Sequence, residues 1–131
     1  MAKAKQLTVS VENRPGMLGE VGCALGVKGV NILAYMGTVN GNRGLVRMVV
    51  DKPAVAKRVF AKHRWDTSEQ EVLMVVLPDK PGSLGRVAHK LREASVNIDY
   101  AYAGLGPTAR RVTAYFSVSD LKVAAIAVAK S

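Results

Sequence analysis

The sequence contains one segment twice. Residues 13–21 (NRPGMLGEV) return 66 positions later as residues 79–87 (DKPGSLGRV). When residues 13–32 are set against residues 79–98, nine of the twenty positions are identical and no gap is needed. Chance similarity does not hold one register over that length, so the chain is two copies of one unit. We therefore expect two domains, residues 1–70 and residues 71–131.

The hydrophobic pattern predicts strand, helix, strand, strand and helix in each copy. Leu7, Val9 and Val11 alternate with polar residues, which is typical of a strand with one buried face. Each Pro-Gly turn is followed by apolar residues at helical spacing. A hairpin turn is expected at 40–41, and Ser119 is the expected N-cap of the last helix. The expected strands are 7–11, 31–39, 46–50, 72–77, 97–103 and 112–118, and the expected second helices are 53–62 and 119–129.

A fourth strand is expected to close each unit, giving the order βαββαβ in an α+β fold whose antiparallel sheets carry helices on one face. Residues 63–71 can supply a short strand of this kind in the first copy. In the second copy Ser131 aligns with Trp65, so no residues remain for it. We expect the second unit to lack its last strand or to take it from another chain. The predicted strand 72–77 is apolar on both faces, as in a strand covered on both sides. Together with the missing strand, this favours a homodimer.

Composition excludes several classes of protein. The formal net charge is +9, but no run of five basic residues occurs, and a solvated surface explains the charge best. No apolar stretch is long enough to span a membrane. Cys23 is the single cysteine, so an internal disulfide and a cysteine-based metal site are excluded. We expect no cofactor, and the basic start lacks the apolar core of a secretion signal, which favours the cytoplasm.

The repeated turn, the helix after it and the Val-Asn-Ile that opens the next strand resemble the ACT domain, over about residues 5–70 and again over 71–131. The resemblance implies two ferredoxin-like βαββαβ units in tandem. It also implies a regulatory module that binds small molecules, usually amino acids, at the interface between units paired side by side. The pattern is similar to small stand-alone tandem ACT proteins that have no catalytic domain, which would regulate a separate enzyme if they act on one.

The chemistry of the turn fits an amino-acid ligand. The first backbone N–H groups of a helix have no internal partner, and with the helix dipole they favour a carboxylate. Gly16 lets a ligand approach the backbone closely. The amides of Asn13 and Asn31 can hold an ammonium and a carboxylate, and we expect Asn31 at the same end of the unit as the turn or beside the neighbouring unit. The candidate ligand-binding residues are Asn13, Arg14, Pro15, Gly16, Met17, Leu18, Asn31, Ile32, Asp79, Lys80, Gly82, Ser83, Leu84, Asn97 and Ile98.

In serine-binding members of the ACT family, an asparagine of the turn and an asparagine at the start of the second strand contact the effector. Asn13 and Asn31 match these positions. A histidine two residues before the turn asparagine also contributes there, and this chain has Val11 instead, which puts serine in doubt as the ligand. In the second copy Asp79 replaces the turn asparagine while Asn97 is kept, so the two sites need not be equivalent.

Other interpretations remain. A Pro-Gly turn and an asparagine at a strand start are also ordinary structural features. The RNA recognition motif has the same order of elements and the chain is basic, but the third strands lack its aromatic signature and aromatic residues make up 5% of the chain. A small enzyme is the third possibility, although no catalytic constellation is visible. Cys23 is expected to be a small packed residue, and His63 and His89 are expected to have surface roles.

Overall fold

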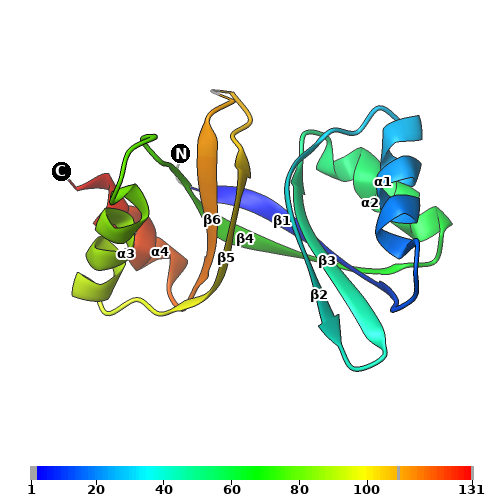
Figure 1. Ribbon diagram of the computed structural model, residues 1–131, viewed down its shortest axis with the longest axis horizontal. Helices are drawn as coiled ribbons and strands as arrows, with labels where there is room; N and C mark the ends of the chain where they lie inside the picture. The colour runs from blue at the N-terminus through cyan, green and yellow to red at the C-terminus, as the bar shows by residue number, and fades with distance from the viewer. Residues whose placement is uncertain (1–2, 109, 131) are drawn as a thin grey trace. The chain divides into compact units, whose positions relative to one another are not determined.

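The computed structural model describes residues 3–108 and 110–130, which form two units (Figure 1). One unit consists of residues 5–70, and the other of residues 71–130 together with Lys3 and Ala4. The chain passes from one unit to the other between Gln70 and Glu71, and Lys3 and Ala4 lie in the unit of residues 71–130. The reason is the length of β1 (Lys3–Glu12), which pairs with its neighbour β3 only from Leu7 onward.

The unit of residues 5–70 is an antiparallel sheet with two helices on one face (Figure 1). Within it, β3 pairs with β1 on one side and with β2 on the other. The alternating Leu7, Val9 and Val11 are all buried and pack with apolar residues of both helices. The elements are β1, α1 (Met17–Val27), β2 (Ile32–Asn40), β3 (Arg43–Val50), α2 (Pro53–Lys62) and the first part of β4 (Asp66–Val76).

The unit of residues 71–130 repeats this arrangement. Here β6 pairs with β4 and with β5, again antiparallel. Its core lies between sheet and helices and is centred on Leu73, Leu91 and Phe116. The elements are the second part of β4, α3 (Ser83–Glu93), β5 (Ile98–Leu105), β6 (Val112–Val118) and α4 (Leu121–Ala129).

Two sequence predictions about these elements are wrong. Residues 63–71 and 72–77 do not form two strands, because β4 runs without interruption from Asp66 to Val76. The N-cap of α4 is Asp120, whose carboxylate accepts from Val123 N at 3.0 Å, while the Ser119 hydroxyl accepts from Asn97 N at 2.9 Å.

The alignment of Trp65 with residue 131 also changes. Ile32 pairs with Val50, whereas Ile98 pairs with Val118, so the β5–β6 hairpin between these residues is two residues longer than the β2–β3 hairpin. After this hairpin the repeat is offset by 68 positions rather than 66, and residue 131 corresponds to residue 63. Residue 131 lies outside the described residues, and no strand follows α4 in the part that ends at Lys130. No described helix is long and apolar enough to cross a bilayer.

Candidate functional site

The turn before α1 leaves the start of that helix open. Gly16 is the N-cap and has φ 89°, a left-handed conformation that favours glycine, and no side chain caps the helix. Within the turn, Met17 N donates to Arg14 O at 3.4 Å, and Glu20 N donates to Gly16 O at 2.9 Å. A helix N-terminus without a side-chain cap presents N–H groups and the positive end of the dipole to an anion.

The charge of Arg14 is already paired. Its guanidinium lies 2.8 Å from the Glu20 carboxylate through Nη2 and 3.3 Å from the Glu12 carboxylate through Nε. Because Arg14 is paired, the groups that remain for a ligand carboxylate at this turn are the backbone N–H groups of α1. Asn13 is exposed, and its N–H is held by Asn42 O at 3.2 Å, which leaves the side-chain amide facing solvent.

The second turn has the same backbone conformation as the first, but Ser83 follows its glycine where Met17 follows Gly16. Gly82 has φ 87°, like Gly16. The Ser83 hydroxyl lies 2.6 Å from Pro78 O and 3.0 Å from Lys80 O, and it accepts from Arg86 Nη2 at 3.3 Å. Ser83 is buried and closes the turn, so its predicted role as a ligand contact is not supported by its surroundings.

The two asparagines of the first copy lie at opposite ends of one sheet. Asn13 follows the end of β1, beside the β2–β3 hairpin, while Asn31 precedes β2 and pairs with Asp51 after β3. The nine residues of β2 separate the two ends by about 30 Å at ~3.3 Å per residue. Of the two expectations for Asn31, a position at the same end as the turn is therefore wrong, and a position beside the neighbouring unit stays a prediction. The helix α1 runs back to the end of the sheet where β1 begins, and Asn31 lies at that end.

The predicted apolar site residues fall into two groups. Met17 is buried in the core of its unit, and Ile32 and Ile98 pack partly buried against the cores of theirs. Leu18 and Leu84 are more than half exposed. Leu18 and Ile32 both line a cavity of about 180 Å³ between α1 and β2. The remaining predicted residues (Pro15, Lys80, Asn97) are exposed, as are Asn13 and Asn31.

A pocket at the second turn brings together charges that the sequence did not connect. Asp79, Arg110 and Arg111 line a cavity of about 560 Å³ beside the end of β4. Arg110 has a left-handed backbone, with φ 51°. A carboxylate and two guanidiniums around one cavity match the ammonium and carboxylate of an amino acid. The link was invisible in the sequence because the hairpin that carries the arginines is 31 residues away from Asp79.

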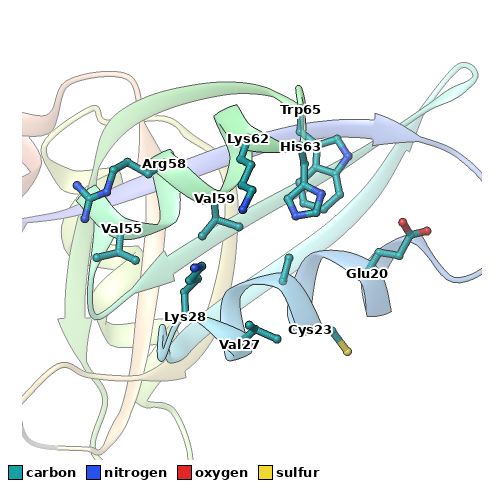
Figure 2. A pocket seen from close by; sticks show the side chains of 11 residues that line it. Glu20, Cys23, Val27, Lys28, Val55, Arg58, Val59, Lys62, His63 and Trp65 are labelled. Atoms are coloured by element: carbon teal, nitrogen blue, oxygen red, sulfur yellow. The ribbon is translucent and has the colours of Figure 1, made fainter.

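A larger cavity lies on the helical side of the first unit, between α1 and α2 (Figure 2). We name it the helix groove, and its volume is about 860 Å³. Cys23 lines it and is exposed, so the expectation of a packed cysteine is wrong. Sequence analysis missed this groove entirely. The residues that line it are Glu20, Cys23, Ala24, Val27, Lys28, Val55, Arg58, Val59, Lys62, His63 and Trp65.

The aromatic residues of the third strand of the second unit do not form a stacking surface for bases. Tyr115 and Phe116 are buried, and the Tyr115 hydroxyl donates to Leu105 O at 2.7 Å. Burial raises the pKa of Tyr115. Since recognition of single-stranded RNA by this fold uses exposed aromatics, the observed burial argues against it. Among the described residues, no group of His, Cys, Asp and Glu could hold a metal ion.

Comparison with solved structures shows a shared fold. Protein BT0572 from Bacteroides thetaiotaomicron has a TM-score of 0.86 at 24% identity, over 98% of this chain and 88% of that chain. The aspartate kinase regulatory subunit from Thermus thermophilus has a TM-score of 0.66 at 16% identity, covering 98% and 91%. That from Thermus flavus has 0.60 at 16% identity, covering 98% and 92%.

Sequence comparison identifies the family. No curated protein sequence matches the chain. A family model described as an ACT domain pair matches residues 2–113. It spans both turns and both of the helices that follow them. The resemblance drawn from the repeated turn is thereby confirmed, and the chain belongs to the ACT domain pair family.

Proposed function

We propose that the protein is a non-catalytic regulatory module that binds a free amino acid between two ACT units. The observation that carries this proposal is the separation of the two asparagines. A free amino acid cannot reach Asn13 and Asn31 of one unit, because they lie at opposite ends of the sheet. A site that uses both kinds of asparagine must therefore take its turn from one unit and its strand start from another.

The two turns suggest two sites with different charge. At the first turn, the uncapped N-terminus of α1 would accept the ligand carboxylate, and Asn13 would hold its ammonium group. At the second turn, Asp79 would take the ammonium, and Arg110 or Arg111 would take the carboxylate. Asn97 and Asn31 are the proposed partners of the first and second turns.

We also propose that each unit is a ferredoxin-like βαββαβ domain with its fourth strand in place. In the first unit this strand is the beginning of β4, where Glu69 lies 2.8 Å from Lys57 Nζ and 3.9 Å from Lys5 Nζ of β1. In the second unit the proposed fourth strand is the beginning of β1, since Lys3 and Ala4 belong to that unit.

Calorimetric titration with each of the twenty amino acids tests the proposed function. We expect heat of binding from at least one of them and from few others. Asn13→Ala should then abolish binding at one site, and Asn97→Ala should abolish the same site. Asn31→Ala and Asp79→Ala should each abolish binding at the other site. Asn40→Ala, an exposed asparagine in the hairpin region, is the matched control and should bind normally.

Two outcomes would overturn the proposal. One is the absence of heat with all twenty amino acids. The other is a site that loses binding with Asn13→Ala and Asn31→Ala together while Asn97→Ala leaves it intact. Light scattering tests the expected homodimer in the same samples, and a monomeric mass at working concentration would rule the dimer out.

A further inference from the structure

The helix groove of the first unit combines an apolar floor with unpaired positive charge. Ala24, Val55 and Val59 form part of the floor, and Trp65 closes one end, where its ring stacks on His63 at 4.4 Å. The volume of about 860 Å³ lies within the ~300–1,000 Å³ of pockets that hold drug-sized ligands. A free amino acid would leave most of this volume empty, so the groove suits a larger molecule.

The cations of the groove converge and lack acidic partners. Lys28 at the end of α1 and Lys62 at the end of α2 point toward one another across the groove (Figure 2). Within the described chain, no carboxylate lies within ion-pair distance of Lys28, Arg58 or Lys62. The one acid on the rim, Glu20, is paired with Arg14 at 2.8 Å. The groove is therefore complementary to an anion.

The second unit shows what this helix pair looks like without a groove. Lys90 stands in the repeat where Ala24 stands in the first unit, and its amine donates to Lys130 O at 2.7 Å, so it bridges α3 to the end of α4. The cavity there is about 270 Å³. Ala94 and Ile126 occupy the positions of Lys28 and Arg58. Both the open volume and the convergent cations are thus properties of the first copy alone.

We propose that the helix groove binds a small amphipathic anion, an apolar chain or ring system that carries a carboxylate or an equivalent acid group. The apolar body would lie on Ala24, Val55 and Val59, and the acid group would lie between Lys28 and Lys62. This site is separate from the proposed amino-acid sites, and its ligand belongs to a different chemical class.

Fluorescence titration with 1-anilinonaphthalene-8-sulfonate tests the proposal, because this probe is an aromatic body with one acid group. We expect one probe per chain, and we expect decanoate to displace it. Lys28→Gln/Lys62→Gln should weaken binding of the probe about tenfold, since both charges that would face its acid group are lost. Arg92→Gln/Lys122→Gln removes the same net charge from exposed positions of the second unit and should change the affinity less than about twofold.

A second variant separates volume from charge. Ala24→Lys adds a positive charge but fills the groove as Lys90 does in the other unit. We expect this variant to bind the probe about tenfold more weakly or worse. If diffuse electrostatic attraction alone held the probe, the added charge would strengthen its binding. N-phenyl-1-naphthylamine, the same aromatic body without the sulfonate, should bind weakly and respond to Ala24→Lys but not to Lys28→Gln/Lys62→Gln.

The exposed thiol of Cys23 reports occupancy directly. Decanoate should slow its modification by an uncharged maleimide, while Cys23→Ser/His89→Cys, which moves the thiol to the corresponding position in the second unit, should react at the same rate with and without decanoate.

Three results would each overturn the proposal. The first is equal weakening of probe binding by both double variants, and the second is unchanged binding of the probe to Ala24→Lys. The third is a Cys23 thiol that reacts only on dilution, because a second copy of the chain would then cover the groove. Asn13→Ala should leave probe binding unchanged, so failure here is distinguishable from failure of the amino-acid site.

Discussion

Asn31 and Asp51 hold each other by two hydrogen bonds. Asn31 N donates to the Asp51 carboxylate at 2.8 Å, and Asp51 N donates to Asn31 O at 3.1 Å. Asn97 and Ser119 repeat the arrangement in the second unit, with a hydroxyl in place of the carboxylate, at 2.9 and 3.0 Å. The start of β2 is thus fixed to the end of β3, and the side-chain amide of Asn31 is left exposed.

Asp51→Ala should lower the free energy of unfolding by about 1 kcal/mol, because the N–H of Asn31 loses its acceptor. Asp51→Ser should recover more than half of that loss, since serine accepts the equivalent bond in the second unit. Urea denaturation measures both variants. Equal destabilisation by alanine and serine would show that the hydrogen bond is not the stabilising contact.

Two glycines six residues apart should respond to alanine with opposite sign. Gly16→Ala should destabilise the protein by about 1–2 kcal/mol, because φ 89° is strained for any residue with a Cβ. Gly22→Ala should stabilise it by about 0.5–1 kcal/mol, since a Cβ there meets no atom within 4 Å and alanine favours the helix interior. Thermal unfolding followed by circular dichroism gives both values, and shifts of the same sign would contradict the assignment of the two conformations.

Asp120 caps α4, and its loss should be measurable. Asp120→Ala removes the acceptor for Val123 N and should cost about 1 kcal/mol of unfolding free energy. Ser119→Ala removes a different bond, the one that its hydroxyl accepts from Asn97 N, and leaves the helix cap in place. Lys122→Ala is the control. Lys122 is an exposed residue of the same helix outside the Asp120–Val123 cap bond, so its replacement should leave the stability nearly unchanged.

The stability of the protein should fall in alkaline solution through Tyr115. Burial raises the pKa of Tyr115 above its ordinary value of about 10. The protonated phenol is therefore favoured in the folded state. This contribution is complete below pH ~10 and is lost as the pH rises toward the raised pKa of the folded protein.

Tyr115→Phe should remove that part of the pH dependence and also the hydrogen bond to Leu105 O. Chemical denaturation of wild type and variant between pH ~8 and pH ~11 measures the difference. The gap between the two proteins should narrow as the pH rises. Tyr35→Phe, at an exposed position, should show no such trend, and a constant gap for Tyr115→Phe would contradict the expected linkage.

The repeat and its hydrophobic spacing predicted the family and nearly every element, because both depend on local residue patterns. The proline and the apolar spacing predict a helix over residues 53–62, and the structure has α2 at Pro53–Lys62. Asn40-Gly41 marked a hairpin that the structure shows, with Gly41 at φ 63°. The division of β4 into two strands failed because the sequence pattern could not show that one strand serves two units in succession.

The candidate sites depended on distances that a sequence does not contain. One of the two positions expected for Asn31, the end of the unit that carries the turn, is wrong because α1 returns the chain to the end of the sheet where β1 begins. Asp79 and Arg111 share a cavity only because β4 and β6 pair. The helix groove had a signal that could have been read, namely Ala24 where the second copy has Lys90, but its meaning required the bridge from Lys90 to Lys130.

The membership of Lys3 and Ala4 in the second unit has a consequence for how the chain folds during synthesis. The first unit is inserted within the second, so no single cut of the chain can separate the two intact. Residues 5–70 can close their core as soon as they emerge from the ribosome. The second unit must wait for residues 71–130, and it then joins ends that are separated by the whole of the first, a loop whose closure costs entropy. Folding is therefore expected to be ordered, with the inner unit first.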